Sequence, residues 1–257
     1  MKKIRVENLV VKYRGVIEAV KNICFSVKEG EVLGILGPNG AGKTTILKAI
    51  AKLVDYKGAI YIDGAEVART PMKTIARIIS YASDIRTPDF MPLSVKEALL
   101  MSRYPRMKGF FEKREDIAIV DKIMKRLNIH NLSDRKLSEL SSGELRKVVI
   151  AMALAKEPKY ILLDEPDSHL DLHSKIMVSN MIKELAKDHV IVFTSHDILF
   201  TINTADYILL IKNGMVVKYG SVEKVVEDNV LEKVYNVKFI RVKINGRILP
   251  IPVYLSS

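Results

Sequence analysis

Short apolar runs alternate along the chain with stretches that have helical spacing. Nearly continuous apolar runs occur at residues 32–36, 160–163, 190–194 and 207–211, as is typical of strands that are buried on both faces of a sheet. Helical spacing follows at residues 44–53, 171–187 and 197–204. This order of strands and helices predicts an α/β fold with a largely parallel sheet.

The same pattern predicts how the chain is organised. Further strands are expected at residues 6–13, 23–27, 58–62, 78–82 and 215–219. Between them, residues 94–104, 113–128 and 142–156 are mostly helical in pattern. We therefore expect one unit at residues 1–220, made of an α/β core (1–82 and 157–220) and a helical insertion (83–156). The tail, residues 221–257, should contain a short helix and a hairpin, because Asn245-Gly246 separates two alternating stretches, 236–244 and 247–254.

Composition excludes several classes of protein. The 257 residues are 48% hydrophobic and 28% charged, so the chain has enough apolar material for a core and is not mainly disordered. A single cysteine, Cys24, permits no internal disulfide. No apolar run approaches the length of about 20 residues that a membrane span needs, and the N-terminus lacks the pattern of a signal peptide. We therefore expect a soluble intracellular protein.

The net charge of +11 favours anionic partners: nucleotides, nucleic acid or an anionic membrane surface. Charge alone does not choose among them, and a solvated lysine-rich surface is an equally good explanation.

A phosphate-binding loop follows the first buried strand. Its residues fit the pattern G-x-x-x-x-G-K-[ST] and are Gly37, Pro38, Asn39, Gly40, Ala41, Gly42, Lys43 and Thr44, with Thr45 next in the chain. The glycines allow backbone N–H groups to point at phosphate oxygens, and the following helix directs its positive end to the same place. Lys43 should contact the β- and γ-phosphates, and Thr44 should ligate Mg²⁺.

Two carboxylates end the strand at residues 160–163. Adjacent acids at this edge are costly unless a cation or ligand is bound there, although such a pair can also be only a helix cap. We expect Asp164 to face Mg²⁺ and Glu165 to activate a water for attack on the γ-phosphate. His196 follows the strand expected at residues 190–194. At that end of the strand it could contact the γ-phosphate. Histidines in such positions are also often structural.

Four further motifs, in the expected order, resemble those of one family, the nucleotide-binding subunits of ABC transporters. Leu140-Ser141-Ser142-Gly143-Glu144 resembles the LSGGQ signature of that family, and Tyr13 occupies the place of its adenine-stacking aromatic. Ser168-His169-Leu170-Asp171 resembles its D-loop, and Ser195-His196-Asp197 resembles its switch histidine.

The resemblance implies a fold and a mechanism. The fold would be a P-loop NTPase core with an N-terminal antiparallel β-subdomain and an inserted α-helical subdomain. The chain would hydrolyse ATP with Mg²⁺, with Lys43, Glu165 and His196 as catalytic residues. Two copies, or two similar chains, would close head to tail around two ATP molecules. One chain's signature and D-loop would then contact the nucleotide on the other; the residues concerned are Ser141, Ser142, Gly143, Glu144 and Asp171.

Two positions depart from the family pattern. Asp84 stands where the family usually has glutamine, and the chain contains no glutamine at all. Asp84 could still bind Mg²⁺ as a hard oxygen ligand, but it cannot donate a hydrogen bond as an amide does. Ser142 replaces a glycine of the signature, which is a small change.

Short segments narrow the resemblance to importers of iron chelates, haem and cobalamin. These segments are residues 95–105, 234–237 and 246–252, although an ordinary hairpin explains the last equally well. The implied protein lies at the cytoplasmic face of the membrane, on two transmembrane permease subunits that also engage an extracytoplasmic substrate-binding protein.

Phe90, Met91 and Leu93 would contact the permease or would instead form the core of the insertion. The alternative function is a soluble ABC ATPase, such as an iron–sulfur cluster assembly component. A nucleic-acid-linked ATPase is disfavoured because the chain is short and has no duplicated cassette, so no nucleic acid partner is expected.

Overall fold

The chain folds around a six-stranded sheet. The computed structural model describes residues 2–14, 17–83, 92–107, 112–244 and 246–253. Strand order in this sheet is β10-β9-β3-β8-β7-β6, and the pairs are parallel except for β9 with β10. The strands are β3 (Val32–Leu36), β6 (Ile79–Ala82), β7 (Tyr160–Leu163), β8 (Val190–Ser195), β9 (Tyr207–Lys212) and β10 (Met215–Ser221). Every residue of β3, β7 and β8 is buried, as their apolar runs predicted.

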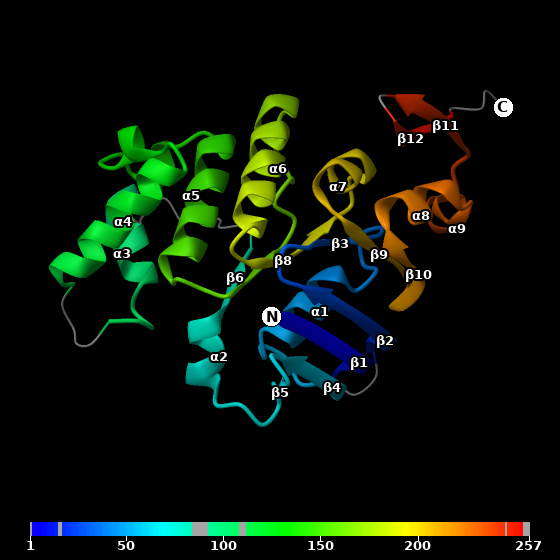
Figure 1. The fold of residues 1–257 in the computed structure, drawn as a ribbon, viewed down its shortest axis with the longest axis horizontal. Coiled ribbons are helices and arrows are strands. Elements are labelled where there is room, and N and C mark those ends of the chain that lie inside the picture. Colours follow the sequence, from blue (N-terminus) through cyan, green and yellow to red (C-terminus); the bar gives the residue numbers. More distant parts are fainter. Residues whose placement is uncertain (1, 15–16, 84–91, 108–111, 245, 254–257) are drawn as a thin grey trace.

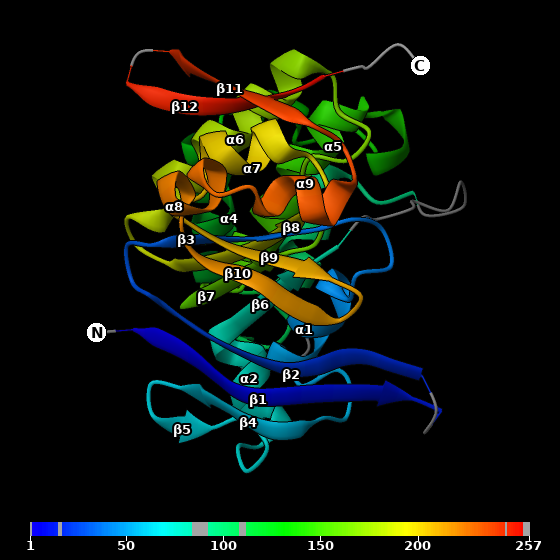
Figure 2. The ribbon, with the colours of Figure 1, turned by 90° about the vertical axis from the view of Figure 1, so that its right-hand side faces the viewer.

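A second sheet lies beside the first, at the bottom of Figure 2. It is antiparallel, with strand order β2-β1-β4-β5. Its strands are β1 (Lys3–Tyr13), β2 (Ile17–Lys28), β4 (Lys57–Ile62) and β5 (Ala65–Glu66). Ile4 and Val6 are buried while Arg5 between them is exposed, the alternation that one solvated face requires. This is the N-terminal antiparallel sheet that the family resemblance implied.

Helices cover the sheets. Helix α1 (Lys43–Ile50) packs in the same apolar cluster as β1, β2 and β3. It ends three residues before the predicted end at residue 53, because Lys52 takes a left-handed backbone (φ 58°) and Leu53 is 49% exposed. Helices α6 (Leu172–Ala186) and α7 (Ile198–Thr204) occur where their spacing predicted them.

The predicted helical segments pack together at one end of the molecule, at the left of Figure 1. They are α3 (Val95–Ser102), α4 (Arg114–Arg126) and α5 (Ser142–Ala155), with the short 3-10 turns His130–Leu132 and Leu137–Glu139 between the last two. Helix α2 (Met72–Ile78) was not predicted. Ile75 is its only buried side chain, so the segment carries no apolar stripe. Phe90 and Met91 lie outside the described residues, and Leu93 is half-buried.

The C-terminal tail packs beside β9 and β10. One short helix was predicted there, but the structure has two, α8 (Val222–Glu227) and α9 (Val230–Tyr235). The expected hairpin is present as β11 (Phe239–Ile244) and β12 (Arg247–Pro252), whose last pair is Ile244 with Arg247. Strand β12 contacts both α7 and α8. In the described part of the chain, no helix has the length and apolar character needed to cross a membrane.

Candidate functional site

The phosphate loop connects β3 to α1 and is held tightly by its neighbours. Gly42 has a φ of 100°, and a Cβ there would lie 2.4 Å from the carbonyl oxygen of Ala19 in β2. A Cβ on Gly37 would lie 2.4 Å from the carbonyl oxygen of Ile211 in β9. Glycine is therefore needed at both ends of the loop for steric reasons. The loop ends at the N-terminus of α1, which favours anions.

Lys43 folds back over this loop. Its side chain is only 4% exposed, and its ammonium lies 3.5 Å from Oε1 of Glu165. The ammonium donates hydrogen bonds to the carbonyl oxygens of Gly37 (2.9 Å) and Pro38 (3.1 Å). Burial lowers the pKa of Lys43, and the nearby Glu165 opposes that shift. The loop thus holds a nearly buried cation next to the predicted catalytic carboxylate.

Asp164 is fixed by three hydroxyl groups. Its Oδ1 accepts hydrogen bonds from Thr44 (2.9 Å) and Thr194 (2.6 Å). Its Oδ2 accepts one from Tyr81 (3.0 Å). Burial and the charge of Asp164 both raise the pKa of Tyr81, so the phenol stays a neutral donor. Tyr81 and Thr194 were not predicted as site residues, although each lies near the C-terminal end of a strand next to β7.

Glu165 lies between two basic side chains. Its Oε1 is 3.5 Å from the Lys43 ammonium and 3.7 Å from Nδ1 of His196. The backbone N–H of Glu165 donates to the Thr194 hydroxyl (2.9 Å), and its φ of 48° is unusual for a residue other than glycine. A strained backbone that is held by specific contacts is common at functional sites. The structure thus brings together Lys43, Glu165 and His196, as the sequence suggested.

A buried carboxylate that sequence reasoning missed lies beside this group. Asp167 is 1% exposed, and its Oδ2 accepts a hydrogen bond from the Ser195 hydroxyl (2.8 Å). Its Oδ1 is buried and has no hydrogen-bond partner among the described residues. Burial raises the pKa of Asp167, and the Ser195 bond opposes that shift. Asp167 lies four residues after the end of β7, beyond the adjacent acid pair that marks the strand end, so the local pattern gives no signal for it.

Asp167→Asn is expected to stabilise the protein at neutral pH. Because the pKa of Asp167 is raised in the folded state, the charged carboxylate destabilises that state as pH rises above the usual aspartate range. Removing a poorly satisfied buried charge is worth about 1 kcal/mol or more, and each 1 kcal/mol is roughly 2–4 °C of Tm in a chain of this size. Thermal unfolding at pH 8 and pH 4 checks this, and a gain that is equal at both values would contradict it.

Two adjoining cavities surround the phosphate loop. One, of about 190 Å³, is lined by Ala19, residues 39–45 and Glu165. The other, of about 440 Å³, is lined by Asn39, Gly40, Thr44, Ser83, Asp164, Glu165, Ser168 and His169. Asn39, Gly40, Thr44 and Glu165 line both cavities. The predicted phosphate-binding and carboxylate residues therefore share one continuous hollow.

Tyr13 lies next to the start of α1. Its hydroxyl is 3.4 Å from the Thr45 hydroxyl, and its side chain is exposed. The ring is thus available beside the phosphate loop, where the resemblance implies that adenine stacks. That role stays a prediction.

The signature residues form the start of α5. Ser141 caps this helix by accepting a hydrogen bond from the Glu144 N–H, and Glu144 in return accepts from the Ser141 N–H (2.9 Å). A Cβ on Gly143 would lie 2.5 Å from the Ser174 hydroxyl in α6. Ser142 is exposed. Among the described residues that line the two cavities, none comes from the signature.

Asp171 also caps a helix. Its carboxylate accepts a hydrogen bond from the Ser174 N–H (2.7 Å) at the start of α6. This contact explains the residue structurally, and a nucleotide contact by Asp171 stays a prediction.

The site offers suitable ligands for Mg²⁺. Thr44 supplies a hydroxyl oxygen and Asp164 a carboxylate oxygen, the hard donors that this ion prefers. Within the described ranges, no group of three or more His, Cys, Asp or Glu side chains could hold a metal. Phosphate and water oxygens would therefore complete the coordination, as is usual for Mg²⁺. Asp84, the other predicted ligand, lies outside the described residues.

Comparison with known proteins gives one consistent result. Residues 20–168 match the family described as ABC transporter. An uncharacterized ABC transporter ATP-binding protein of Methanocaldococcus jannaschii is 35% identical over 92% of each chain. The petrobactin import ATP-binding protein of Bacillus subtilis is 31% identical, over 91% of this chain and 92% of its own. Among solved structures, a metal-chelate type ABC transporter in an inward-facing conformation aligns with a TM-score of 0.85 and 26% identity, over 98% of each chain.

Proposed function

The chain belongs to the ABC transporter family as an ATP-binding subunit, and from this premise we propose that it hydrolyses ATP to drive the import of a chelated metal ion. The observation that carries the proposal is the placement of Glu165 at the phosphate loop, between Lys43 and His196. The kind of cargo is inferred from similar proteins: one is named for petrobactin import, and one solved structure is of the metal-chelate type.

Each residue of the site has a distinct part in hydrolysis. The phosphate loop and Lys43 bind the β- and γ-phosphates of ATP. Glu165 accepts a proton from the water that attacks the γ-phosphorus, while the bond from that phosphorus to the bridging oxygen breaks. Lys43 and His196 both lie close to this carboxylate before the nucleotide binds. His196, which follows β8, would contact the γ-phosphate.

Thr44 and Asp164 would hold Mg²⁺. When bound, this ion neutralises charge on the phosphate oxygens. The hydrogen bonds from Tyr81 and Thr194 keep the Asp164 carboxylate in one orientation, which is the support that a metal-binding carboxylate needs.

The signature acts on a second copy of the chain. It lies at the N-terminus of α5, which can bind a γ-phosphate, but it does not line the cavities beside the phosphate loop among the described residues. A head-to-tail dimer would bring the signature of one chain to the phosphate loop of the other. Family membership supports dimerisation in general, and this arrangement is the specific form that we propose.

Mixing two inactive variants tests this arrangement. Lys43→Ala damages the phosphate loop, and Ser142→Arg blocks the signature while leaving the cap residue Ser141 in place. Each variant alone is expected to lack ATPase activity. A mixture should regain part of it, because mixed dimers contain one intact phosphate loop facing one intact signature. If each chain completed its own site, the mixture would stay as inactive as its components.

The subunit is proposed to act at the cytoplasmic face of the membrane. Its partners would be two permease subunits, which in turn receive cargo from an extracytoplasmic substrate-binding protein. The soluble alternative, an iron–sulfur assembly ATPase, is not supported, since the petrobactin relative and the metal-chelate structure are both transporter proteins.

Affinity purification from membranes tests the transport function. The tagged chain is recovered from its own cells with and without detergent solubilisation, and its partners are identified by mass spectrometry. We expect a partner with many apolar segments of about 20 residues each, recovered only with detergent. Recovery of a soluble partner alone would overturn the importer function while leaving the ATPase chemistry intact.

A further inference from the structure

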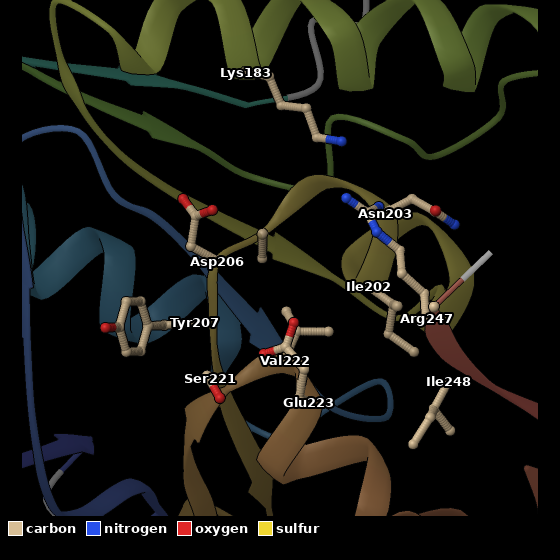
Figure 3. A pocket seen from close by; sticks show the side chains of 12 residues that line it. Lys183, Ile202, Asn203, Asp206, Tyr207, Ser221, Val222, Glu223, Arg247 and Ile248 are labelled. Carbon is tan, nitrogen blue, oxygen red and sulfur yellow. The ribbon is translucent and has the colours of Figure 1, made fainter. Parts of the chain in front are cut away.

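A cavity of about 330 Å³ lies between the start of β12 in the C-terminal hairpin and helices α6, α7 and α8. Its walls come from α6, α7, the junction of β10 with α8, and the start of β12 (Figure 3). The lining residues include none from the phosphate loop among those described. Its size lies within the range of roughly 300–1,000 Å³ that is typical of small-molecule sites.

Two cationic side chains extend into this cavity. Lys183 comes from α6 and Arg247 from the first position of β12, and Figure 3 shows both reaching into the same space. Within the described part of the chain, neither one forms a hydrogen bond or ion pair with an acceptor. Arg241, on the same hairpin, is different. It donates to both carboxylate oxygens of Glu232 (2.9 and 3.1 Å) and to the carbonyl oxygen of Val226 (2.7 Å).

Among the described residues, no carboxylate forms an ion pair or hydrogen bond with either cation. Burial lowers the pKa of Lys183, and Arg247 lowers it further through like-charge repulsion. Asp206 opposes the shift, but one of its carboxylate oxygens already accepts a hydrogen bond from the Val32 N–H (2.8 Å). Glu223 lies on another wall, near the start of α8 (Figure 3). A bound anion would therefore relieve an unfavourable arrangement between Lys183 and Arg247.

We propose that this cavity binds a small oxyanion with two or more negative charges, held between Lys183 and Arg247. Phosphate and carboxylate groups share the required chemistry, because both accept hydrogen bonds from guanidinium and ammonium groups. Asp206 and Glu223, which also line the cavity, would repel the charged part of the ligand. A ligand of this kind would be separate from the nucleotide that the phosphate loop binds.

Binding would connect the tail to the ATPase core. Arg247 belongs to the hairpin, whereas Lys183 belongs to α6, which packs on the central sheet through buried residues such as Ile182. The described hairpin already contacts α7 and α8 and, through Arg241, Glu232 of α9. An anion held by both Lys183 and Arg247 would add a direct link from the hairpin to α6. We expect bound oxyanion to slow hydrogen exchange in β11 and β12.

Titration calorimetry of the full chain tests the site. Inorganic phosphate and citrate are titrated separately, with sodium chloride keeping the ionic strength constant. Saturable binding of one ligand per chain is expected for at least one of them, and the tighter of the two identifies the ligand class. Lys183→Ala and Arg247→Ala should each weaken binding about tenfold or more, because each removes a charge-assisted contact. Glu223→Gln should strengthen it.

Two control variants separate this site from other sources of binding. Lys187→Ala, at the C-terminal cap of α6 and outside the cavity lining, should leave the affinity unchanged. Lys43→Ala should also leave it unchanged, which excludes phosphate bound at the phosphate loop. The proposal is overturned if neither oxyanion binds saturably, or if binding survives Lys183→Ala and Arg247→Ala. Unchanged hydrogen exchange of the hairpin at saturation would overturn the link to the tail.

Discussion

Glu165→Gln is expected to stop ATP hydrolysis while leaving ATP binding intact. The Glu165 carboxylate lines both cavities at the phosphate loop, so it can reach a water beside the γ-phosphate. Glutamine keeps the size of the side chain but cannot accept a proton from that water. Loss of general-base catalysis costs about 10²–10⁴-fold in rate. Steady-state phosphate release measures this loss, and equilibrium binding of a fluorescent ATP analogue measures what is retained.

The same variant should accumulate as an ATP-bound dimer. If closure depends on the γ-phosphate, a chain that binds ATP without cleaving it stays closed. Size-exclusion chromatography with ATP should therefore show a dimer for Glu165→Gln and less of it for the unmodified chain. Glu184→Gln is a matched control, because Glu184 is an exposed residue of α6 whose ion-pair partner in the described part of the chain is Lys187. It should leave both turnover and dimer content unchanged.

Turnover measurements also show whether Glu165 or His196 is the general base. Its Nδ1 lies 3.7 Å from Oε1 of Glu165, so either side chain could in principle take the proton. If Glu165 is the base, Glu165→Gln loses more activity than His196→Ala does. Normal turnover in Glu165→Gln, with turnover lost in His196→Ala, would transfer the role to the histidine.

Local patterns allowed most of the phosphate site to be predicted. The phosphate loop is read from residue types at fixed spacing, and both Gly37 and Gly42 occupy positions where a side chain would collide with backbone. Asp164 and Glu165 follow a buried apolar run, so their place at the sheet edge is visible in the sequence. These features depend on neighbours within a few residues, which is why a single sequence is enough to find them.

The remaining residues of the site depend on strand order. Tyr81 and Thr194 reach Asp164 only because β6 and β8 lie on either side of β7, and no local pattern specifies those neighbours. Asp167 becomes significant only through its burial against Ser195. The limits of helix α1 were likewise missed, because a left-handed residue, Lys52, ends it before the apolar spacing stops.

The signature illustrates a different limit. Its residues are recognised from sequence, and the structure accounts for three of them within one chain: Ser141 and Glu144 cap α5, and Gly143 packs on α6. A helix cap alone would explain these contacts. The proposed second chain is supported by the exposed Ser142 together with the absence of signature residues from the described lining of the phosphate cavities.

Lys43→Ala is expected to abolish ATP binding without unfolding the protein. The Lys43 ammonium is the one basic group that already contacts the phosphate loop in the described structure, through the carbonyl oxygens of Gly37 and Pro38. A charge-assisted contact to phosphate contributes about 1.5–3 kcal/mol, or roughly 10–100-fold in affinity for each such bond. Since Lys43 should contact two phosphates, we expect the fluorescent analogue to show no saturable binding at millimolar concentration.

Lys43→Ala is expected to change the stability of the nucleotide-free protein very little. Burial lowers the pKa of Lys43, so the folded state disfavours the charged ammonium, and its removal should cost little stability without nucleotide. Glu165 loses one cation but keeps His196 nearby and is partly exposed to water. The Tm without nucleotide is therefore expected to stay close to that of the unmodified chain, whereas ATP should raise the Tm of the unmodified chain only.

Lys48→Ala provides the matched control for this experiment. Lys48 lies in the last turn of the same helix, α1, and does not line either phosphate cavity. The Lys48→Ala variant should bind ATP with unchanged affinity, and ATP should raise its Tm as much as it raises the Tm of the unmodified chain. If Lys43→Ala instead lowers the Tm strongly without nucleotide, the lysine holds the loop in shape, and lost binding is then a consequence of folding. If Lys43→Ala binds ATP normally, the phosphate contact assigned to this residue is wrong, and the backbone of the loop alone provides the affinity.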